Sequence, residues 1–445
     1  MKRRSLIVWL AVLAVVAAAC SSTGGGETST TVATETTAVD STTATSGAAG
    51  EPSPTQIEFL SIIAEDDSWM TVLGQVAELH IEEHPGSSFD VQFSDGESHD
   101  QQLQLLASSD SLPVMYHNFS DLASTRSAQE RGVLMDLEPV LDELGITDLI
   151  TPAARDTMKS TWGVVTLPFE MSITGFWYNK QMFGDLDLVP PTTWEELLEV
   201  ADVLAENDIQ PFAASGISGW PIADIIGFHI FANVGPDSLQ AVADGNASLT
   251  DPEYVESARY VAEIGNRGYF GPGVSDLDYD AARDLFLAGG AGMYLMGSWV
   301  LPAFNDPAIN LVGAENVGWF PLPLGDTGEQ VSSLQIGWPV VVNEALYDEG
   351  FGEFLVTVAE NFGTMALEEQ GHISGFAVDE IPESVAPLTE LIVSELESAG
   401  TPVTWFYQLF NARGQDESHA NAALLVTGQM SPEDYMQAIQ TALEE

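Results

Sequence analysis

The stretch IEFLSIIAEDDSWMTVLGQVAELHIEEHPGSSFDVQF, residues 57–93, decides the fold class. Its first part, residues 57–63, is mostly apolar and rich in β-branched residues, which is typical of a buried strand in a parallel or mixed sheet. Apolar residues then recur at helical spacing over residues 69–79, and His84-Pro85-Gly86 ends this helix. Residues 89–93 alternate between apolar and polar, as a second strand would. The order strand, helix, strand predicts an α/β fold.

Further helices follow along the chain. Leu103, Leu105 and Leu106 begin a second helix. Residues 193–196 form a capping box, in which the Thr hydroxyl and the Glu three residues later satisfy each other's backbone N–H groups. Ser431, with Pro432 at the first helical position, caps a last helix. At 445 residues and 45% hydrophobic, the chain can form one large core or two modest ones, and we expect two lobes.

The charge of the chain excludes nucleic-acid binding. Twelve Lys and Arg stand against 67 Asp and Glu, which gives a formal net charge of −55. Binding to a phosphate backbone needs clustered cations, and this surface would repel DNA and an anionic bilayer alike. No nucleic-acid partner is expected.

The N-terminus carries the pattern of a secretory signal. Lys2-Arg3-Arg4 precedes an apolar run over residues 6–19, and the chain's one cysteine, Cys20, follows directly. The pattern resembles a bacterial lipobox, in which cleavage exposes a cysteine that carries lipid, although Ala17 stands where Leu is usual. A free thiol with ordinary cleavage nearby is the alternative. We expect a signal peptide at 1–19 and a lipidated Cys20 that starts a disordered Ser/Thr/Gly linker over 20–55.

Two patterns point to enzyme or metal chemistry. His80-Ile81-Glu82-Glu83-His84 fits H-x-x-E-H, an inverted zinc-protease helix, but no second cluster supplies an obvious third ligand. We interpret it as a polar helix terminus with solvated Glu82 and Glu83. Acidic residues near predicted strand ends could support glycosidase chemistry: Glu65, Asp66, Asp67, Asp95 and Glu170. With 67 acids in the chain such coincidences are expected, and neither a nucleophile elbow nor a phosphate loop is present.

Tryptophans beside glycine, serine or proline are the most unusual feature. They occur in Gly219-Trp220-Pro221, Gly297-Ser298-Trp299, Gly337-Trp338-Pro339 and Thr404-Trp405. A core Trp normally lies inside a periodic segment, as Trp69 and Trp194 do. A loop Trp near a strand end can offer a flat apolar face to a sugar ring, while nearby carboxylates and amides bind its hydroxyls. Each Trp alone is equally consistent with packing, but the set favours a ligand site.

Two longer segments carry a family resemblance. Residues 167–170 (LPFE), 175–183 (GFWYNKQMF) and 190–197 (PPTTWEEL) together resemble the central signature of extracellular solute-binding proteins of sugar ABC importers, the class of maltose-binding protein. Residues 282–299 (ARDLFLAGGAGMYLMGSW) resemble the family's F-x-x-G-x-A-A-M-x-x-x-G-x-W segment. Residues 82–86 (EEHPG) match the family's first-helix ending, which argues against the zinc motif. The resemblance covers about residues 56–445, in order.

The resemblance implies two α/β lobes of the type II periplasmic-binding-protein fold, joined by crossing segments, with the ligand cleft between them. Hinge closure of this kind is the established behaviour of periplasmic binding proteins. The first lobe would comprise residues 56–167 and 338–378, and the second residues 168–337 and 379–445.

The resemblance also implies the site. Glu170, Trp220 and Trp299 would line the cleft, with stacking by the two tryptophans and hydroxyl pairing by Glu170. Weaker implications are Trp338 and Trp405 and, from the first lobe, Glu65, Asp67, His117 and Asn118. Residues 112–118 (LPVMYHN) depart from the family, whose members often read P-D-V here, so the usual Asp is absent. Trp177 lies in an apolar run and is expected to pack in the core.

The function implied is a membrane-anchored extracellular receptor that captures a carbohydrate, expected to be an oligosaccharide, and delivers it to the permease subunits of an ABC importer. We expect a monomer, with no bond chemistry, no metal and no cofactor. The alternatives are a lipid-anchored secreted glycosidase that uses cleft carboxylates, and a metal-capturing receptor that uses His80 and His84.

Overall fold

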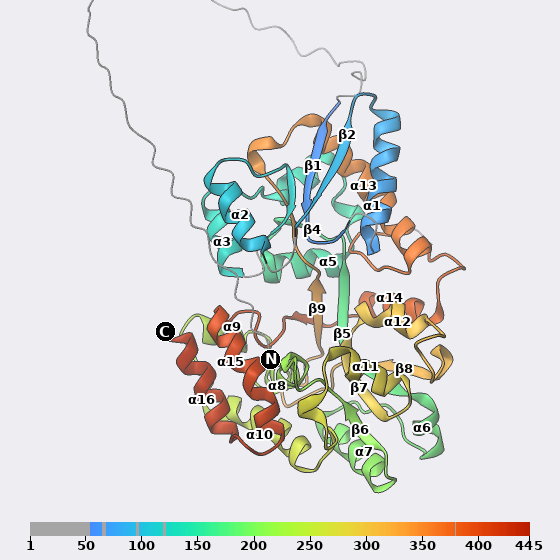
Figure 1. The fold of residues 1–445 in the computed structure, drawn as a ribbon, viewed down its shortest axis with the longest axis vertical. Coiled ribbons are helices and arrows are strands. Elements are labelled where there is room, and N and C mark those ends of the chain that lie inside the picture. Colours follow the sequence, from blue (N-terminus) through green and yellow to red (C-terminus); the bar gives the residue numbers. More distant parts are fainter. Residues whose placement is uncertain (1–53, 65–67, 95–97, 119–121, 379) are drawn as a thin grey trace, which may run out of the picture. The chain divides into compact units, whose positions relative to one another are not determined.

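The computed structural model describes residues 54–64, 68–94, 98–118, 122–378 and 380–445 (Figure 1). The predicted signal peptide, Cys20 and all of the linker except its last two residues lie outside this part, as do Glu65 and Asp67. Across the described ranges, we find no helix whose length and apolar character would let it cross a bilayer.

The first sheet has the strand order β2-β1-β3-β10-β4. β1 (Gln56–Ser61) pairs in parallel with β2 (Ser88–Phe93) and with β3 (Met115–His117). β10 (Val340–Val342) is antiparallel to β3 and to β4 (Thr166–Leu167). The helices of this part are α1 (Ser68–Glu83), α2 (His99–Ser108), α3 (Leu122–Glu130), α4 (Leu137–Leu144), α5 (Pro152–Thr157) and α13 (Glu349–Gln370). α1 packs along α13 (Figure 1).

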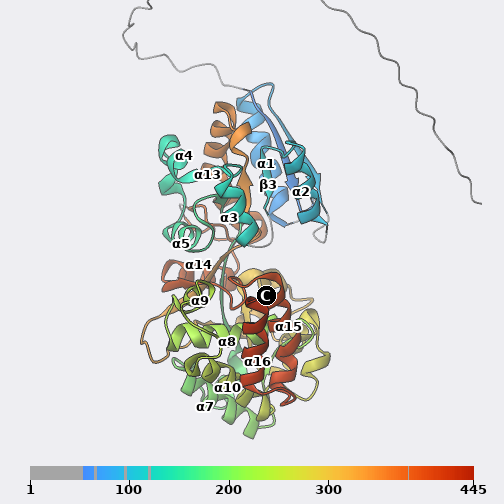
Figure 2. The ribbon, with the colours of Figure 1, turned by 90° about the vertical axis from the view of Figure 1, so that its left-hand side faces the viewer.

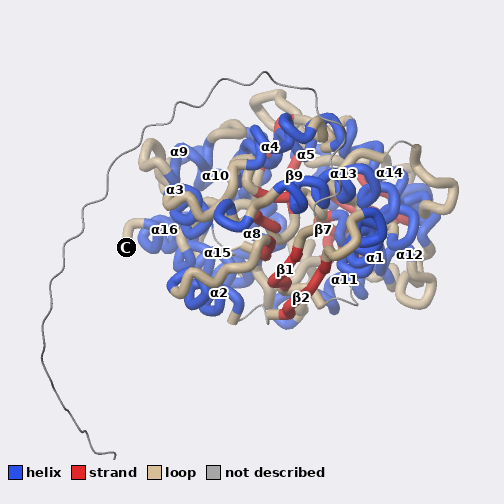
Figure 3. The backbone as a smooth tube through the Cα atoms, turned by 90° about the horizontal axis from the view of Figure 1, so that it is seen from above, coloured by secondary structure: helices blue, strands red, loops and turns tan. Residues whose placement is uncertain are grey.

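The second sheet has the order β11-β9-β5-β7-β6, with β8 also paired to β5. Its strands are β5 (Met171–Asn179), β6 (Gln210–Ala213), β7 (Ala291–Gly297), β8 (Val317–Phe320), β9 (Val331–Ile336) and β11 (Thr401–Val403). Its helices are α6 (Lys180–Asp185), α7 (Trp194–Glu206), α8 (Trp220–Asn233), α9 (Ser238–Ala243), α10 (Pro252–Asn266), α11 (Tyr279–Leu287), α12 (Leu301–Asn305), α14 (Pro387–Glu397), α15 (Ala412–Val426) and α16 (Pro432–Leu443). α8, α10, α15 and α16 pack together (Figure 2), and helices flank the strands (Figure 3).

The predicted elements of residues 57–93 are confirmed to within a few residues: β1, α1 and β2 occupy 56–61, 68–83 and 88–93. The second helix begins earlier than its apolar residues indicate, at His99. Of its three leucines only Leu103 is fully buried, whereas Leu105 is 68% exposed. The two residues lie on different faces of the helix, so only one can face the sheet.

The capping box at residues 193–196 is half correct. The Thr193 side chain accepts from the Glu196 N–H, as predicted. The Glu196 carboxylate, however, accepts from the backbone N–H and the hydroxyl of Thr192 at 2.7 Å each, and not from Thr193. The predicted cap by Ser431 is confirmed, since its side chain accepts from the Asp434 N–H.

Strand β5 contributes to the two larger of the three hydrophobic clusters formed by the described residues. Ile173 and Trp177 belong to a cluster that extends to β1, α1 and α13, whereas Phe176 belongs to a second cluster with α7, α8, α10, α15 and α16. Alternate residues of a strand face opposite sides of the sheet, so β5 is buried on both faces. Trp177 is completely buried and its Nε1 donates to the Met296 carbonyl at 3.0 Å, which confirms the expected packing role.

The chain passes between the two sheets three times: from β4 to β5, from β9 to β10, and from α13 to β11. The first two passages are tied together, because the Gly337 N–H donates to the Glu170 carbonyl at 3.1 Å. The Asn118 N–H donates in turn to the Pro339 carbonyl at 2.8 Å. These bonds join the end of β3 to the crossing segments.

Candidate ligand-binding site

The second sheet brings its loop tryptophans to one edge. β6 is parallel to β7 and β11 to β9, and both β7 and β9 are antiparallel to β5, so β6, β7, β9 and β11 all run in one direction. A tryptophan follows the carboxyl end of each of the four: Trp220, Trp299, Trp338 and Trp405. β5 runs the opposite way, so Glu170, just before its first residue, lies at the same edge. In α/β sheets this edge is where ligands bind.

Five partly exposed rings gather here, and we call them the aromatic cluster: Trp220, Tyr279, Trp299, Trp405 and Tyr407. The Trp299 ring lies 6.1 Å from that of Trp220 and 5.9 Å from that of Trp405. Trp220 also lies 6.5 Å from Trp405 and 6.3 Å from Tyr279, and Trp405 lies 5.9 Å from Tyr407. Rings at these distances stabilise one another, and they form a continuous apolar surface.

The Gly-Ser-Trp sequence at the end of β7 has a local explanation. Ser298 starts a 3₁₀ turn, and its hydroxyl accepts from the Ile173 N–H at 3.2 Å, which ties the turn to β5. A Cβ on Gly297 would lie 1.9 Å from the Trp299 ring, so only glycine leaves room for the indole. The Trp299 Nε1 donates to the Tyr279 hydroxyl at 2.9 Å, which fixes the ring orientation.

Glu170 presents a carboxyl group beside this surface. Desolvation raises the pKa of Glu170 above its ordinary value, although the residue keeps part of its accessible surface. Gly337 makes room for it, since a Cβ there would lie 2.4 Å from Glu170 Oε2. The Gly-Trp-Pro sequence therefore serves two purposes: it admits the Glu170 carboxyl and carries Trp338, which is 43% exposed.

Two adjoining cavities share Glu170, Ser172 and Trp299. One, of about 310 Å³, is also lined by Gln335, Trp338, Trp405, Tyr407, Gln408 and Gln415. The other, of about 410 Å³, extends towards Pro302 and His372. The His372 Nε2 bonds to the Phe169 carbonyl at 2.8 Å, and burial lowers the pKa of His372 to about 4, so this side chain is neutral at pH 7. Among the described residues that line these two cavities there is neither Lys nor Arg, and Glu170 is the one acid.

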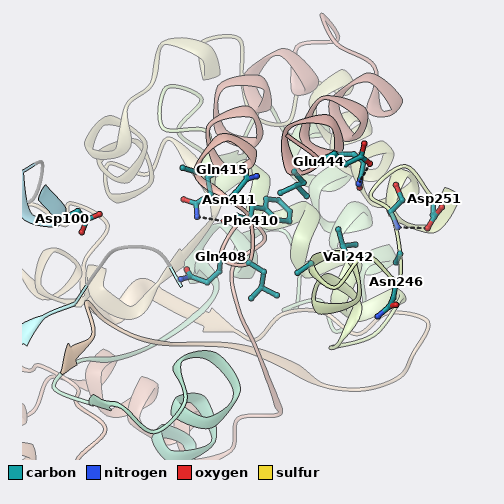
Figure 4. Close-up of a pocket in the computed structure, with 17 residues that line it drawn as sticks. Asp100, Val242, Asn246, Asp251, Gln408, Phe410, Asn411, Gln415 and Glu444 are labelled. Atoms are coloured by element: carbon teal, nitrogen blue, oxygen red, sulfur yellow. Dashed lines mark hydrogen bonds between the residues drawn. The ribbon is translucent and has the colours of Figure 1, made fainter. Parts of the chain in front are cut away.

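A larger groove of about 1040 Å³ continues from the first cavity, because Gln408 and Gln415 line both (Figure 4). Apart from the hydroxyl of Ser248, the polar side chains among its described lining residues are carboxylates and amides, again without Lys or Arg: Asp100, Asn246, Asp251, Gln408, Asn411, Gln415, Gln440 and Glu444. Several of these side chains are fixed by backbone contacts. The Asn411 side chain caps α15 and donates to the Ala442 carbonyl, and Gln440 accepts from the Leu249 N–H.

The first-lobe candidates His117 and Asn118 are buried, unlike the aromatic cluster. His117 is the last residue of β3 and Asn118 follows it, and both are 0% exposed. His117 stacks on Phe59 and its Nδ1 accepts from the Ile62 N–H at 3.3 Å, while burial lowers its pKa to about 3. The Asn118 amide donates to Thr125 at 2.8 Å. Neither residue lines the cavities above, so contact of either with a ligand stays a prediction; Glu65 and Asp67 lie outside the described residues.

The H-x-x-E-H segment ends α1, with Glu82 and Glu83 exposed as expected. His80 differs from the polar terminus that the sequence indicates, because it is fully buried against α13, 3.3 Å from the Thr357 hydroxyl. Its ring stacks on that of His84, whose Nδ1 lies 3.2 Å from a carboxylate oxygen of Glu353. Among the described residues, no three His, Cys, Asp or Glu side chains lie together as metal ligands would.

Sequence reasoning missed Tyr279, Tyr407 and the glutamines Gln335, Gln408 and Gln415. Tyr279 opens α11, twenty residues before its partner Trp299, and no local pattern connects the two. Tyr407 could have been found, because it lies two residues after Trp405 in a segment already singled out for its loop tryptophan.

Comparison with known proteins identifies the class. Residues 65–357, more than half of the chain, match the family of bacterial extracellular solute-binding proteins. The chain belongs to this family, which is one of binding proteins and not of enzymes. The comparisons lend no support to a glycosidase, whose chemistry requires a pair of carboxyl groups about the scissile bond.

Individual relatives agree with this assignment. An ABC transporter extracellular-binding protein of Pyrococcus horikoshii is 25% identical over 198 residues, and the multiple sugar-binding protein of Streptococcus mutans is 25% identical over 182 residues. The matches cover 44% and 38% of this chain and 44% and 40% of those proteins, so the chain spans less than half the length of either relative.

Similarity to solved structures extends much further. A chitin oligosaccharide binding protein has a TM-score of 0.72 at 24% identity, and the match covers 88% of this chain and 98% of that protein. At this identity the likeness shows the fold, and the expected two-lobed α/β fold is confirmed.

Proposed function

We propose that this protein is the carbohydrate receptor of an ABC importer and binds its ligand on the aromatic cluster. The observation that carries the proposal is the position of the cluster: five partly exposed rings at the carboxyl edge of the second sheet, beside a carboxyl group and several amides. The C–H face of a sugar ring stacks on such rings, and its hydroxyls pair with carboxylates and amides.

The proposed contacts follow from this geometry. Trp220, Trp299 and Trp405 would stack on sugar rings, Trp338 would cover the ligand from the crossing segment, and the Glu170 carboxylate would accept from a hydroxyl. Because the lining residues of these cavities include no Lys or Arg, a neutral ligand fits better than an anionic one. His117 and Asn118 would then support the site from within the first lobe.

An oligosaccharide fits better than a monosaccharide, because the groove lined by amides and carboxylates continues the cavity beside Trp405 (Figure 4). The relative from Streptococcus mutans is itself described as a multiple sugar-binding protein. We therefore propose that the first ring binds on the aromatic cluster and that later rings follow the groove.

The remaining parts of the proposal concern the whole protein. Strand membership supports lobes of residues 56–167 with 338–378 and 168–337 with 379–445, because the passages from β4 to β5 and from β9 to β10 fall at these limits. We propose that the lobes close on the sugar, that Cys20 carries a lipid anchor on the outer face of the membrane, and that a monomer delivers the ligand to the permease subunits.

Thermal unfolding tests the ligand class. The chain from Ser21 onward would be melted with chitotriose, xylotriose, maltotriose and their monosaccharides, with amino acids, dipeptides and divalent metals as controls. A ligand at 100 times its dissociation constant should stabilise the fold by about 2.7 kcal/mol. Stabilisation by one sugar class, with no product in chromatography of the same sample, supports the receptor. Stabilisation only by peptides, amino acids or metals overturns the ligand class, and sugar cleavage overturns the binding function.

A further inference from the structure

A carboxyl group is buried directly behind the aromatic cluster. Asp224 lies one turn after Trp220 on α8, in a stretch where every residue from Pro221 to Ala232 is buried, and it is 0% exposed. Residues four apart on a helix share a face. Asp224 therefore lies on the same side of α8 as the Trp220 ring, one layer deeper.

Asp224 holds the segment that carries two rings of the cluster. Its Oδ1 accepts from the Phe406 N–H at 3.0 Å. Phe406 is fully buried, whereas its neighbours Trp405 and Tyr407 are partly exposed and belong to the cluster. The β11 ladder ends at Val403, so this bond fixes the backbone beyond the last strand pair.

The fit between α8 and this segment is close. A Cβ on Gly227, three residues after Asp224, would lie 2.6 Å from the Phe406 Cβ and 2.9 Å from its Cα. Gly227 and Asp224 thus both contact Phe406 from α8. The backbone of Phe406 can lie against α8 only because Gly227 has no side chain.

The carboxyl group is unfavourable for stability by itself. Its Oδ2 is buried without a hydrogen-bond partner, and burial of an incompletely bonded carboxyl costs free energy that an apolar side chain would not. Its hydrogen bond is with the segment that carries Trp405 and Tyr407. A role in the geometry of the site therefore explains why a carboxyl group is placed here.

We propose, on the basis of the proposed function, that Asp224 is a positioning residue of the binding site, which fixes the Phe406 backbone so that Trp405 and Tyr407 form a preorganised surface for the sugar. Preorganisation raises affinity because less ordering remains to be done on binding. Asp224 itself is too deeply buried to touch the ligand.

The test compares three variants with the wild type in the absence of ligand. Coupled tryptophans give a near-ultraviolet circular dichroism signal that depends on their mutual geometry. Asp224→Leu, which removes the acceptor, should lose most of this signal, whereas Asp224→Asn keeps an amide oxygen for the Phe406 N–H and should retain it. His229→Leu is the matched control on the same helix, because His229 bonds to Ser257 on α10 and not to the Phe406 segment.

Gly227→Ala is a second, independent perturbation. Alanine favours the helix by itself, so any lost signal must come from its contact with Phe406. This variant keeps the proposal testable if Asp224→Leu fails to fold, as judged by its far-ultraviolet spectrum. Loss of the signal in Asp224→Leu or Gly227→Ala, with retention in Asp224→Asn and His229→Leu, supports the proposal. Signals unchanged in both perturbing variants, or lost equally in His229→Leu, overturn it.

Sugar titration of the same variants provides the functional arm. Asp224→Leu removes the hydrogen bond that fixes the Phe406 backbone, so it should weaken chitotriose binding about tenfold. Asp224→Asn should restore the affinity. The spectroscopic arm uses unliganded protein, so failure of the wild type to bind any sugar overturns the proposed function, while the spectra still decide the role of Asp224. Undiminished affinity in Asp224→Leu overturns that role.

Discussion

The end of β3 in the first sheet and the carboxyl ends of β6, β7, β9 and β11 in the second are equivalent positions, but their side chains are used differently. His117 and Asn118 at the end of β3 are fully buried, and His117 stacks on Phe59. The four tryptophans after the second-sheet strands keep part of their surface, up to 43% for Trp338. The same topological position thus holds a packed, neutral polar group in one lobe and an exposed aromatic surface in the other, so variants should affect stability in the first and affinity in the second.

Among the candidate site residues, the largest expected effect is at His117 and concerns stability in acid. Burial lowers the pKa of His117 to about 3 in the folded state, whereas its ordinary pKa is 6.5. Below pH 6.5 the imidazole therefore takes up a proton in the unfolded chain but stays neutral in the folded one. The stability contributed by the neutral ring is present above pH 6.5 and is lost as the pH falls towards 3, by about 1.4 kcal/mol per pH unit.

Replacement of the ring should remove this dependence. His117→Gln keeps an acceptor, and between pH 6.5 and 4.5 its free energy of unfolding should fall by about 2 kcal/mol less than that of the wild type. Urea unfolding at several pH values measures the difference. An equal pH dependence in variant and wild type would contradict the stabilising role of His117. A large loss of sugar affinity with stability intact would mean that the first-lobe position serves binding, as the second-lobe positions do.

The opposite pattern is expected at Trp299. Trp299→Ala should weaken sugar binding by about 1–3 kcal/mol, because a central aromatic anchor is lost. The free energy of unfolding should change less than in Trp177→Ala, the fully buried tryptophan of the same sheet, where about 3–5 kcal/mol is expected. Titration calorimetry with chitotriose and urea unfolding of both variants make the comparison, and an unchanged affinity would remove Trp299 from the site.

A change at Glu170 should affect both the stability of the free protein and its affinity for sugar. Its raised pKa means that the folded state holds a proton more tightly than the unfolded chain, so this group's stabilising contribution is present at low pH and is lost as the pH rises through the folded pKa. At pH 7 Glu170→Gln should therefore raise the melting temperature of the free protein, while sugar affinity falls by about 1 kcal/mol because a neutral acceptor replaces a charged one. A lower melting temperature at pH 7 would show that the carboxylate stabilises the fold.

The smallest effect is expected at Trp338, which is the most exposed of the site tryptophans. Trp338→Ala should weaken binding by about 0.5–1 kcal/mol, since much of its ring stays in water when a ligand stacks on one face. Titration with the same sugar checks this value. A loss equal to that of Trp299→Ala would mean that the crossing segment closes tightly over the ligand and covers both faces of the ring.

The local elements and the class of protein could be predicted from the amino-acid sequence alone. The first strand follows from an apolar, β-branched run, the helix after it from apolar periodicity, and the caps of Thr193 and Ser431 from the order of residues within one turn. The segments at 167–197 and 282–299 carried the family resemblance. Such features depend on neighbours a few residues away, so they can be recognised without a fold.

Only the tertiary structure decided which of the candidate residues meet. Trp220, Trp299 and Trp405 come from segments up to 185 residues apart, and the strand order of the second sheet brings them to one edge. Tyr279 joins them from α11, and Asp224 supports them from behind. The burial of His117 likewise depends on Phe59 and Trp69, which pack around its ring from two other elements. Side-chain proximity and burial arise from long-range packing, which local periodicity does not encode.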